Sequence, residues 1–230
     1  MHVLSLPLRQ GLDALGLSLD EHQQNQLLSY VDLMGKWTRV YNLTAVRDPQ
    51  EMLTHHLLDS LSVVLPLRRQ LEALRAEQFG NSQDGQAPSE SHQPFALLDV
   101  GSGAGLPGVV IAITCPDIQV TCLDAVAKKV AFIQQVAATL KLSNLRGLHA
   151  RVETVTNPFD IISSRAFASL TDIVTGSHKA LAKGGVWMAM KGITPDEEIA
   201  ALPEAAKVFH VEQLQVPGLD AQRCLVWMRG

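Results

Sequence analysis

The stretch that decides the fold is residues 97–108, Leu-Leu-Asp-Val-Gly-Ser-Gly-Ala-Gly-Leu-Pro-Gly. An apolar run ends in an acid, enters a loop of alternating glycines and reaches a proline that opens the next helical pattern. This order is typical of a buried strand that turns into a helix, where glycines let the backbone approach a ligand and free N–H groups of the helix face it. A tight strand–helix turn that holds no ligand is the alternative interpretation of the loop alone.

The spacing of the loop excludes two kinds of phosphate site. Leu106 occupies the place of the third glycine in a dinucleotide-binding motif, and no Gly-Lys-Ser or Gly-Lys-Thr follows. The next candidate strand ends at Asp124, 23 positions after Gly101. An acid at that place accepts hydrogen bonds from ribose hydroxyls, or it caps the helix that starts near Val126. A glycine loop and an acid without a phosphate-binding motif favour a nucleoside cofactor that lacks pyrophosphate. S-adenosylmethionine is the natural candidate.

Downstream of residue 95, short apolar runs alternate with helical patterns, which predicts a mostly parallel, doubly wound α/β sheet. The expected strands are Ala96–Val100, Gln119–Leu123, Leu145–Ala150, Asp160–Ser163, Val186–Met190, Val208–Leu214 and Cys224–Met228. The expected helices are Pro107–Ile113, Val126–Leu140, Leu170–Leu181 and Glu197–Leu202. A turn at residues 216–220 joins the last two strands, so we expect an antiparallel hairpin at the sheet edge.

Upstream, residues 1–79 carry helical patterns and few strand signals. One helix is expected from Asp20, whose carboxylate is a cap, to Trp37. A second follows Asp48-Pro49, with Pro66 as its expected end, and a third covers residues 69–77. Residues 80–94, rich in Gly, Ser, Gln and Pro, form a polar linker. We therefore expect a helical cap at 1–79, a linker at 80–94 and a ligand-binding domain at 95–230.

Composition narrows the possible functions. The chain has 230 residues, of which 47% are hydrophobic and 18% charged, with a net charge of −4. This balance excludes a generic polycation held to nucleic acid or membrane by bulk charge. Because no apolar run approaches the ~18 residues of a membrane span and no leader pattern is present, we expect a cytoplasmic protein without a membrane partner. The three cysteines lack metal-binding spacing, so we expect them to be buried and the protein to hold no metal.

Several runs together resemble one family. They are Asp-Val-Gly-Ser-Gly-Ala-Gly-Leu-Pro-Gly (99–108), Leu-Asp-Ala (123–125), His-Ala-Arg-Val-Glu (149–153), Ile-Ser-Ser-Arg-Ala-Phe-Ala-Ser-Leu (162–170), the helical stretch 41–61 that begins Tyr-Asn-Leu-Thr-Ala, and Leu-Gln-Val-Pro-Gly-Leu (214–219). The chain resembles the bacterial 16S ribosomal RNA guanine-N7 methyltransferases, the RsmG or glucose-inhibited division protein B family, from about Lys36 to Val226. The resemblance implies a Rossmann-like, seven-stranded class I methyltransferase sheet with an antiparallel last strand behind an N-terminal helical cap.

The resemblance also implies a cofactor and the residues that bind it. The cofactor is S-adenosylmethionine, and the implied contacts are Gly101, Gly103 and Leu106 in the loop, Asp124 after the second strand, Val152 and Glu153 after the third, and Arg165 after the fourth. The implied partner is 16S ribosomal RNA, which we expect to be presented within the small ribosomal subunit to a monomeric enzyme. A methyltransferase for a small metabolite and a non-catalytic assembly factor are the alternatives.

The chemistry of guanine predicts an unusual catalytic site. Its N7 carries an in-plane lone pair and no proton, so direct in-line displacement needs alignment and no general base. Arg165 is the first catalytic candidate, either as a donor to guanine O6 or as a member of a surface ion pair. Asn42 is the second, either orienting the base or forming a turn hydrogen bond.

Three further residues are candidates for binding the RNA. Arg47 is a phosphate candidate, His56 is an RNA contact or a packing residue, and Lys191 is a phosphate contact or a solvated edge residue. Arg146 and Arg151 are weaker phosphate candidates. No region of the chain is basic overall, so we expect RNA binding to depend on a local patch or on a substrate presented in a folded ribonucleoprotein.

Overall fold

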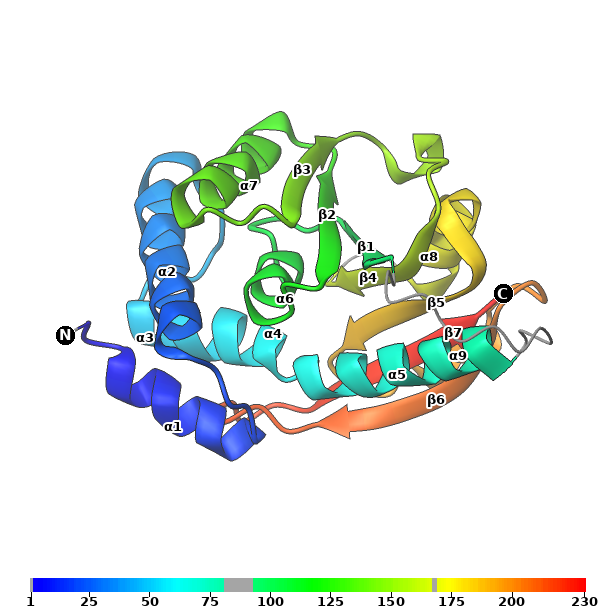
Figure 1. Cartoon of the computed structure of the whole chain (residues 1–230), viewed down its shortest axis with the longest axis horizontal. Helices are drawn as coiled ribbons and strands as arrows, with labels where there is room; N and C mark the ends of the chain where they lie inside the picture. The colour runs from blue at the N-terminus through cyan, green and yellow to red at the C-terminus, as the bar shows by residue number, and fades with distance from the viewer. Residues whose placement is uncertain (1, 81–92, 167–168) are drawn as a thin grey trace.

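The computed structural model describes residues 2–80, 93–166 and 169–230, and within them it contains a seven-stranded sheet in the order β3-β2-β1-β4-β5-β7-β6 (Figure 1). All seven predicted strands are confirmed, and β7 is antiparallel to both of its neighbours. The strands are β1 Phe95–Val100, β2 Ile118–Asp124, β3 Leu145–His149, β4 Phe159–Arg165, β5 Leu181–Lys191, β6 Lys207–Leu214 and β7 Arg223–Arg229. The hairpin at the sheet edge and the expected fold class are therefore confirmed.

The helices that follow the strands lie close to their predicted positions. They are α6 Gly108–Thr114, α7 Ala127–Leu140, α8 Leu170–Ser177 and α9 Asp196–Ala200, with short 3-10 turns η2 Val152–Thr154 and η3 His178–Ala180. One boundary was wrong: the helix predicted over 170–181 ends at Ser177, because η3 follows and Leu181 already belongs to β5. Among the described residues, no helix is both long and apolar enough to cross a bilayer.

The N-terminal region is helical, as predicted, and begins with a helix that the sequence patterns did not single out. Its elements are α1 Ser5–Leu15, α2 Glu21–Tyr41, α3 Pro49–Met52, the π-helical segment η1 Leu53–Leu58, α4 Asp59–Leu61 and α5 Val64–Gly80. The predicted caps are confirmed: the Asp20 carboxylate accepts from the backbone of Gln23, and Asp48 accepts from the first N–H groups of α3.

The expected role of Pro66 was wrong. The chain leaves its helical path at residues 62–63, and Pro66 lies in the first turn of α5, which begins at Val64 instead of residue 69. Proline is tolerated there because the N–H groups of a first helical turn have no partner within the helix. Most of the predicted linker, residues 81–92, lies outside the described residues, so the division at 79 and 95 stays a prediction.

Helices cover both faces of the sheet. The cap helices pack on the same face as α6 and α7, and their apolar side chains join those of the sheet in one cluster that runs from Leu4 to Trp227. In Figure 1 the cap runs down the left side and along the bottom of the sheet. The opposite face is covered by α8 and α9. All three cysteines are buried and free, as predicted.

Side chains of α2 bind the sheet domain through hydrogen bonds. The hydroxyl of Tyr30, which is fully buried, donates to the carbonyl of Ala104 in the glycine loop at 2.7 Å. The amides of Gln23 and Gln26 donate to the last carbonyls of α6 and α7, at 3.0 Å and 2.8 Å. Since a buried carbonyl without a donor is costly, the cap stabilises the loop directly.

The substitution Tyr30→Phe tests this contact. Because it leaves the Ala104 carbonyl buried without its donor, we expect the free energy of unfolding to fall by about 1–2 kcal/mol, measured by chemical denaturation. Tyr41→Phe is the matched control, since Tyr41 is 46% exposed and its loss of a hydroxyl should leave stability unchanged. Equal stability of both variants would show that the bond contributes nothing.

Candidate functional site

The glycine loop holds its shape through left-handed backbone and a buried acid. Gly101, Gly103 and Gly105 have φ values of 65°, 60° and 89°, a region that glycine adopts without strain. Beneath the loop, Asp99 accepts a hydrogen bond from the Ser163 hydroxyl at 2.8 Å and from the backbone N–H of residue 108 at 3.1 Å. The loop is therefore anchored from the neighbouring strand β4.

Burial raises the pKa of Asp99 from 3.8 to about 7, although its hydrogen bonds with Ser163 and Gly108 oppose the shift. A Cβ atom on Gly108 would lie 2.4 Å from the sulfur of Cys122 and 2.9 Å from Asp99 Oδ2. The backbone of Gly108 therefore lies too close to Cys122 and Asp99 to leave room for a side chain, and glycine is required there.

Asp124, at the end of β2, is held by the loop that it faces. Its Oδ2 accepts from the Gly103 N–H at 3.0 Å, and its Oδ1 accepts from the Val126 N–H at 2.9 Å. The Lys129 ammonium lies 3.5 Å from Oδ2. The predicted helix cap is wrong: Val126 is the N-cap residue of α7, and no side chain of the described residues caps that helix. Asp124 accepts instead from the N–H of Val126 itself, and its predicted role with ribose hydroxyls stays a prediction, for which a carboxylate with about four lone-pair sites has room.

A cavity of about 480 Å³ opens at the carboxyl ends of β1, β2 and β3, where open α/β sheets bind their ligands. Its lining combines loop backbone, two acids and two cations, one of which is Arg151, a weaker phosphate candidate: Val100, Gly101, Leu123, Asp124, Ala125, Lys129, Ala150, Arg151, Val152, Glu153 and Ala166. Four of the predicted cofactor residues, Gly101, Asp124, Val152 and Glu153, thus come together. We call this space the loop cavity.

Three predicted cofactor residues do not line the loop cavity. Gly103 lies beside it and gives its N–H to Asp124. Leu106 is buried in the core beneath the cap. Arg165 lines a neighbouring space of about 430 Å³, which we call the cap cavity, together with His55, His56, Asp59, Ala166, Met190, Lys191, Gly192 and Arg223.

The two cavities meet at Ala166, which lines both of them. Ala166 follows β4 directly and has a φ of 51°, a left-handed conformation that is uncommon for a residue other than glycine. Such backbone strain is typical of functional sites. Of the signature run 162–170 that carried part of the family resemblance, residues 167–168 lie outside the described residues.

One buried carboxylate organises the cap cavity. Asp59 is 3% exposed and sits where η1 passes into α4. Its Oδ2 lies 2.8 Å from Arg165 Nη1, and its Oδ1 lies 2.9 Å from Arg223 Nε. Arg165 also donates to the carbonyl of His55 at 3.1 Å. Arg223 is the first residue of β7. Because β7 runs antiparallel to β5, it begins at the edge of the sheet where the parallel strands, including β4, end.

The predicted alternatives for Arg165 are thus resolved only in part. The guanidinium belongs to an ion pair, but the pair is mostly buried and lies at the wall of a cavity instead of on the outer surface. Asp59 occupies one terminal nitrogen of Arg165, which leaves the predicted contact with a ligand open to the other nitrogens.

His56 is a neutral residue of the cap cavity. Its Nε2 lies 2.7 Å from the hydroxyl of Thr44, and its Nδ1 is buried without a hydrogen-bond partner among the described residues. Burial, followed by the charge of Arg165, lowers its pKa from 6.5 to about 4. His56 therefore carries no charge at neutral pH.

The remaining predicted residues lie in two places. Lys191 lines the cap cavity and binds the Glu198 carboxylate at 2.8 Å. Asn42 ends α2 in a left-handed conformation, and its side-chain oxygen accepts from Arg47 at 3.0 Å. Asn42 and Arg47 are both exposed, and neither lines the loop cavity or the cap cavity.

The sequence analysis missed two members of this site, Asp59 and Arg223. A signal for Asp59 was present: a single acid within the apolar run Leu57-Leu58-Asp59-Ser60-Leu61 has to find a buried partner. Arg223 had no such signal, because the pair joins residues 164 positions apart.

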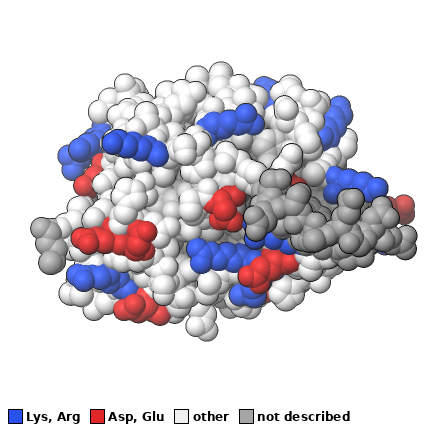
Figure 2. Space-filling view, viewed as in Figure 1, with Lys and Arg blue, Asp and Glu red and all other residues white. Residues whose placement is uncertain are grey.

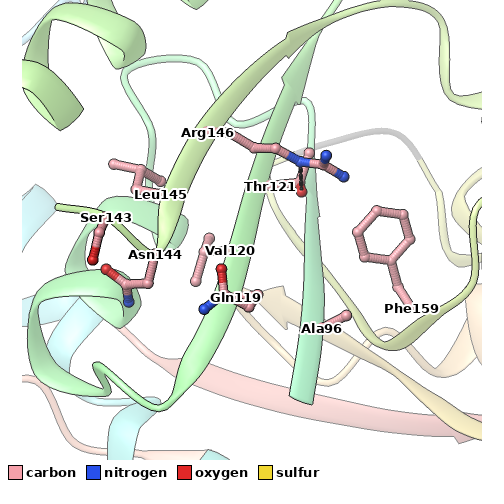
Figure 3. Close-up of a pocket in the computed structure, with 9 residues that line it drawn as sticks. All are labelled: Ala96, Gln119, Val120, Thr121, Ser143, Asn144, Leu145, Arg146 and Phe159. Carbon is pink, nitrogen blue, oxygen red and sulfur yellow. Dashed lines mark hydrogen bonds between the residues drawn. The ribbon is translucent and has the colours of Figure 1, made fainter. Parts of the chain in front are cut away.

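A third cavity, of about 300 Å³, lies at the opposite, amino ends of the strands (Figure 3). It contains Arg146, one of the weaker phosphate candidates, and none of the predicted cofactor residues. Figure 2 shows acidic and basic side chains interspersed over the face that it presents. Among the described residues, no cluster of His, Cys, Asp and Glu has the composition of a metal site.

The pKa of Asp99 makes a testable prediction about stability. Between about pH 4 and pH 7 the folded protein keeps a proton that the unfolded chain has lost, so this group's contribution to the free energy of unfolding falls as the pH rises. Asp99→Asn removes that slope and preserves the shape of the side chain. We expect denaturation curves of the wild type and the variant to converge at low pH and diverge towards neutrality; a constant difference would contradict the raised pKa.

Comparison with known proteins identifies the family. The model of the GidB family, described as rRNA small subunit methyltransferase G, matches residues 23–74 and 69–226. A protein of Polaromonas sp. named ribosomal RNA small subunit methyltransferase G is 64% identical over 96% of this chain and 92% of its own length. Proteins of the same name from Paracidovorax citrulli and Albidiferax ferrireducens are 60% and 62% identical over 98% and 100% of this chain, and over 90% and 98% of their own lengths. The chain therefore belongs to the rRNA small subunit methyltransferase G family.

Proposed function

We propose that this protein transfers a methyl group from S-adenosylmethionine to N7 of a guanine in the decoding-region loop of 16S ribosomal RNA. The observation that carries the proposal is the pair of cavities that share Ala166 at the carboxyl edge of the sheet. The loop cavity has the lining of a nucleoside site, and the cap cavity has the cations Arg165, Lys191 and Arg223 at its wall. Membership of the family supports the assignment of the loop cavity to the cofactor and of ribosomal RNA to the substrate.

The residues of the loop cavity fit this cofactor. Asp124 presents a carboxylate to ribose hydroxyls, and the left-handed backbone at Gly101 lets the amino-acid part approach closely. Val152 and Glu153 offer backbone and a carboxylate to the adenine edge. Gly103 supports the site from behind through Asp124, and Leu106 through the packing of the loop against the cap. When bound, S-adenosylmethionine supplies an electrophilic methyl group on a positively charged sulfur.

The cap cavity suits a base that needs orientation and no proton acceptor. Arg165, fixed by Asp59, donates to guanine O6 through a nitrogen that the ion pair leaves open, which keeps the N7 lone pair unoccupied. His56 packs beside it as a neutral group, and Lys191 binds phosphate at the rim. Asn42, at the exposed end of α2, and Arg47, in the loop that follows it, contact the RNA around the target base. In-line displacement then depends on alignment alone.

The proposal includes how the substrate is presented. The net charge is −4, and acidic and basic side chains are interspersed over the part of the face in Figure 2 that the structure describes, so no broad basic surface for naked RNA is seen on that face. We therefore infer recognition within the small ribosomal subunit in the cytoplasm. The proposal has the protein act as a monomer.

The substitution Asp124→Asn tests the cofactor site. Because the amide keeps the shape of the side chain and loses the charge that accepts from ribose hydroxyls, we expect about tenfold weaker binding of S-adenosylmethionine by calorimetry. Asp117→Asn, at a 61% exposed side chain outside the cavity, is the matched control and should bind as the wild type does. Unchanged affinity of the Asp124 variant would remove this residue from the site.

Labelled methyl transfer tests the reaction. Small subunits that lack the modification, naked 16S RNA and a mixture of small metabolites are offered with labelled S-adenosylmethionine. We expect label in 16S RNA at a guanine N7, faster on subunits than on naked RNA, and its loss in Arg165→Gln. Label in a metabolite, or at another atom of the RNA, would contradict the proposal.

A further inference from the structure

The cavity at the amino ends of the strands has the features of a second binding site. It is lined by Ala96, Gln119, Val120, Thr121, Ser143, Asn144, Leu145, Arg146 and Phe159 (Figure 3). Residue 96 is separated from Gly101 in the loop cavity by most of β1, or about 16 Å at ~3.3 Å per residue. The two sites therefore bind different ligands, or different parts of one large ligand.

The connection between β3 and β4 places no α-helix over the β2–β3 side of this face, which α8 and α9 cover elsewhere. The segments after β1 and β2 carry α6 and α7, which pack on the cap side. The segment between β3 and β4 carries only η2, a three-residue turn. Thr121 and Arg146 point to the opposite face from their neighbours Val120 and Leu145, because side chains alternate along a strand. No α-helix of the β3–β4 connection covers them.

Arg146 is oriented and incompletely used. It is paired in register with Thr121 on the adjacent strand, and its Nε donates to the Thr121 hydroxyl at 2.7 Å. Thr121 is 3% exposed, so this anchor is firmly placed. The two terminal nitrogens of Arg146 have neither a hydrogen bond nor an ion pair within residues 2–80, 93–166 and 169–230. Asp160, next to Phe159 in the chain, accepts from the Ala96 N–H through its Oδ2 at 2.8 Å and makes no hydrogen bond or ion pair with Arg146 in the described structure.

The anchored guanidinium determines the class of ligand. A guanidinium held by Nε presents its two terminal nitrogens as a fork that matches two phosphate oxygens. Figure 3 shows this group extending across β2 towards the side on which Phe159 lies. Phe159 is only 3% exposed and belongs to the core, so the accessible part of the wall is Ala96, and the Gln119 amide adds a hydrogen-bonding group. An arginine fork is a common contact to phosphate in proteins that bind nucleic acids.

We propose that this cavity is a nucleotide-binding site, which takes a phosphate on the fork of Arg146 and the attached nucleoside beside Ala96 and Gln119. The inference rests on the proposed function in one respect: the nucleotide belongs to the ribosomal RNA, so the site is a secondary RNA contact remote from the methylated base. A free nucleotide offers the same chemistry, and the experiment separates the two sources.

Three variants of the full chain test the site. Arg146→Gln removes the fork, and Thr121→Val keeps the charge and the side-chain shape but releases the anchor. Arg9→Gln is the control, because it makes the same charge change at an exposed residue of α1 outside the cavity. Each is measured for KM and kcat on small subunits across a salt series, and each is titrated by NMR with guanosine 5′-monophosphate and with guanosine.

We expect Arg146→Gln to raise the KM for the RNA substrate three- to tenfold, with kcat and S-adenosylmethionine affinity unchanged, and to reduce the salt slope of log KM by about one unit, as loss of one phosphate contact requires. Thr121→Val should raise KM less and keep the slope. The wild-type amides of residues 143–147 should shift with the monophosphate and not with guanosine.

The outcomes are distinct. A monophosphate response without a change in KM would keep the nucleotide site and assign it to a free nucleotide. If Arg146→Gln and Arg9→Gln behave alike on subunits and no amide shifts, the site does not exist. Absence of any methyl transfer by the wild type would contradict the proposed function instead, and the titration would still decide this inference.

Discussion

The contact on which the site depends is the one between Asp59 and its two arginines. A carboxylate that is 3% exposed pays a large desolvation cost, which only close partners offset. Here the partners come from the ends of β4 and β7, while the acid comes from the cap. The pair therefore fixes the cap over the carboxyl edge of the sheet and orients Arg165 in the same step.

The cap and the sheet consequently act as one unit around the two cavities. Tyr30 holds the glycine loop from the cap side, and Asp99 holds it from beneath through Ser163. Both groups are buried, so the loop is set by groups that water does not reach. This arrangement agrees with a reaction whose requirement is alignment of two ligands.

The sequence predicted the sheet well because its information is local. Seven short apolar runs with turn residues between them specify strands, and residues 97–108 specify the loop and the helix that follows. The prediction at Pro66 was wrong because a proline interrupts a helical pattern both where one helix ends and where the next begins. The cofactor candidates that line the loop cavity followed from motif position alone, as with Asp124.

The cap cavity was less predictable. Which acid meets Arg165 depends on how the cap packs on the sheet, and the position of Arg223 depends on the antiparallel direction of β7. The anchor between Arg146 and Thr121 likewise requires the register of β2 and β3, which a single sequence does not specify.

A crystal structure of the protein with S-adenosylhomocysteine and an RNA fragment that contains the target guanosine would test the account most directly. We predict the nucleoside on Asp124 in the loop cavity, the sulfur facing Ala166, and guanine in the cap cavity with O6 on Arg165 and N7 directed at the sulfur. A guanine bound elsewhere, or one whose N7 accepts a hydrogen bond from the protein, would contradict it.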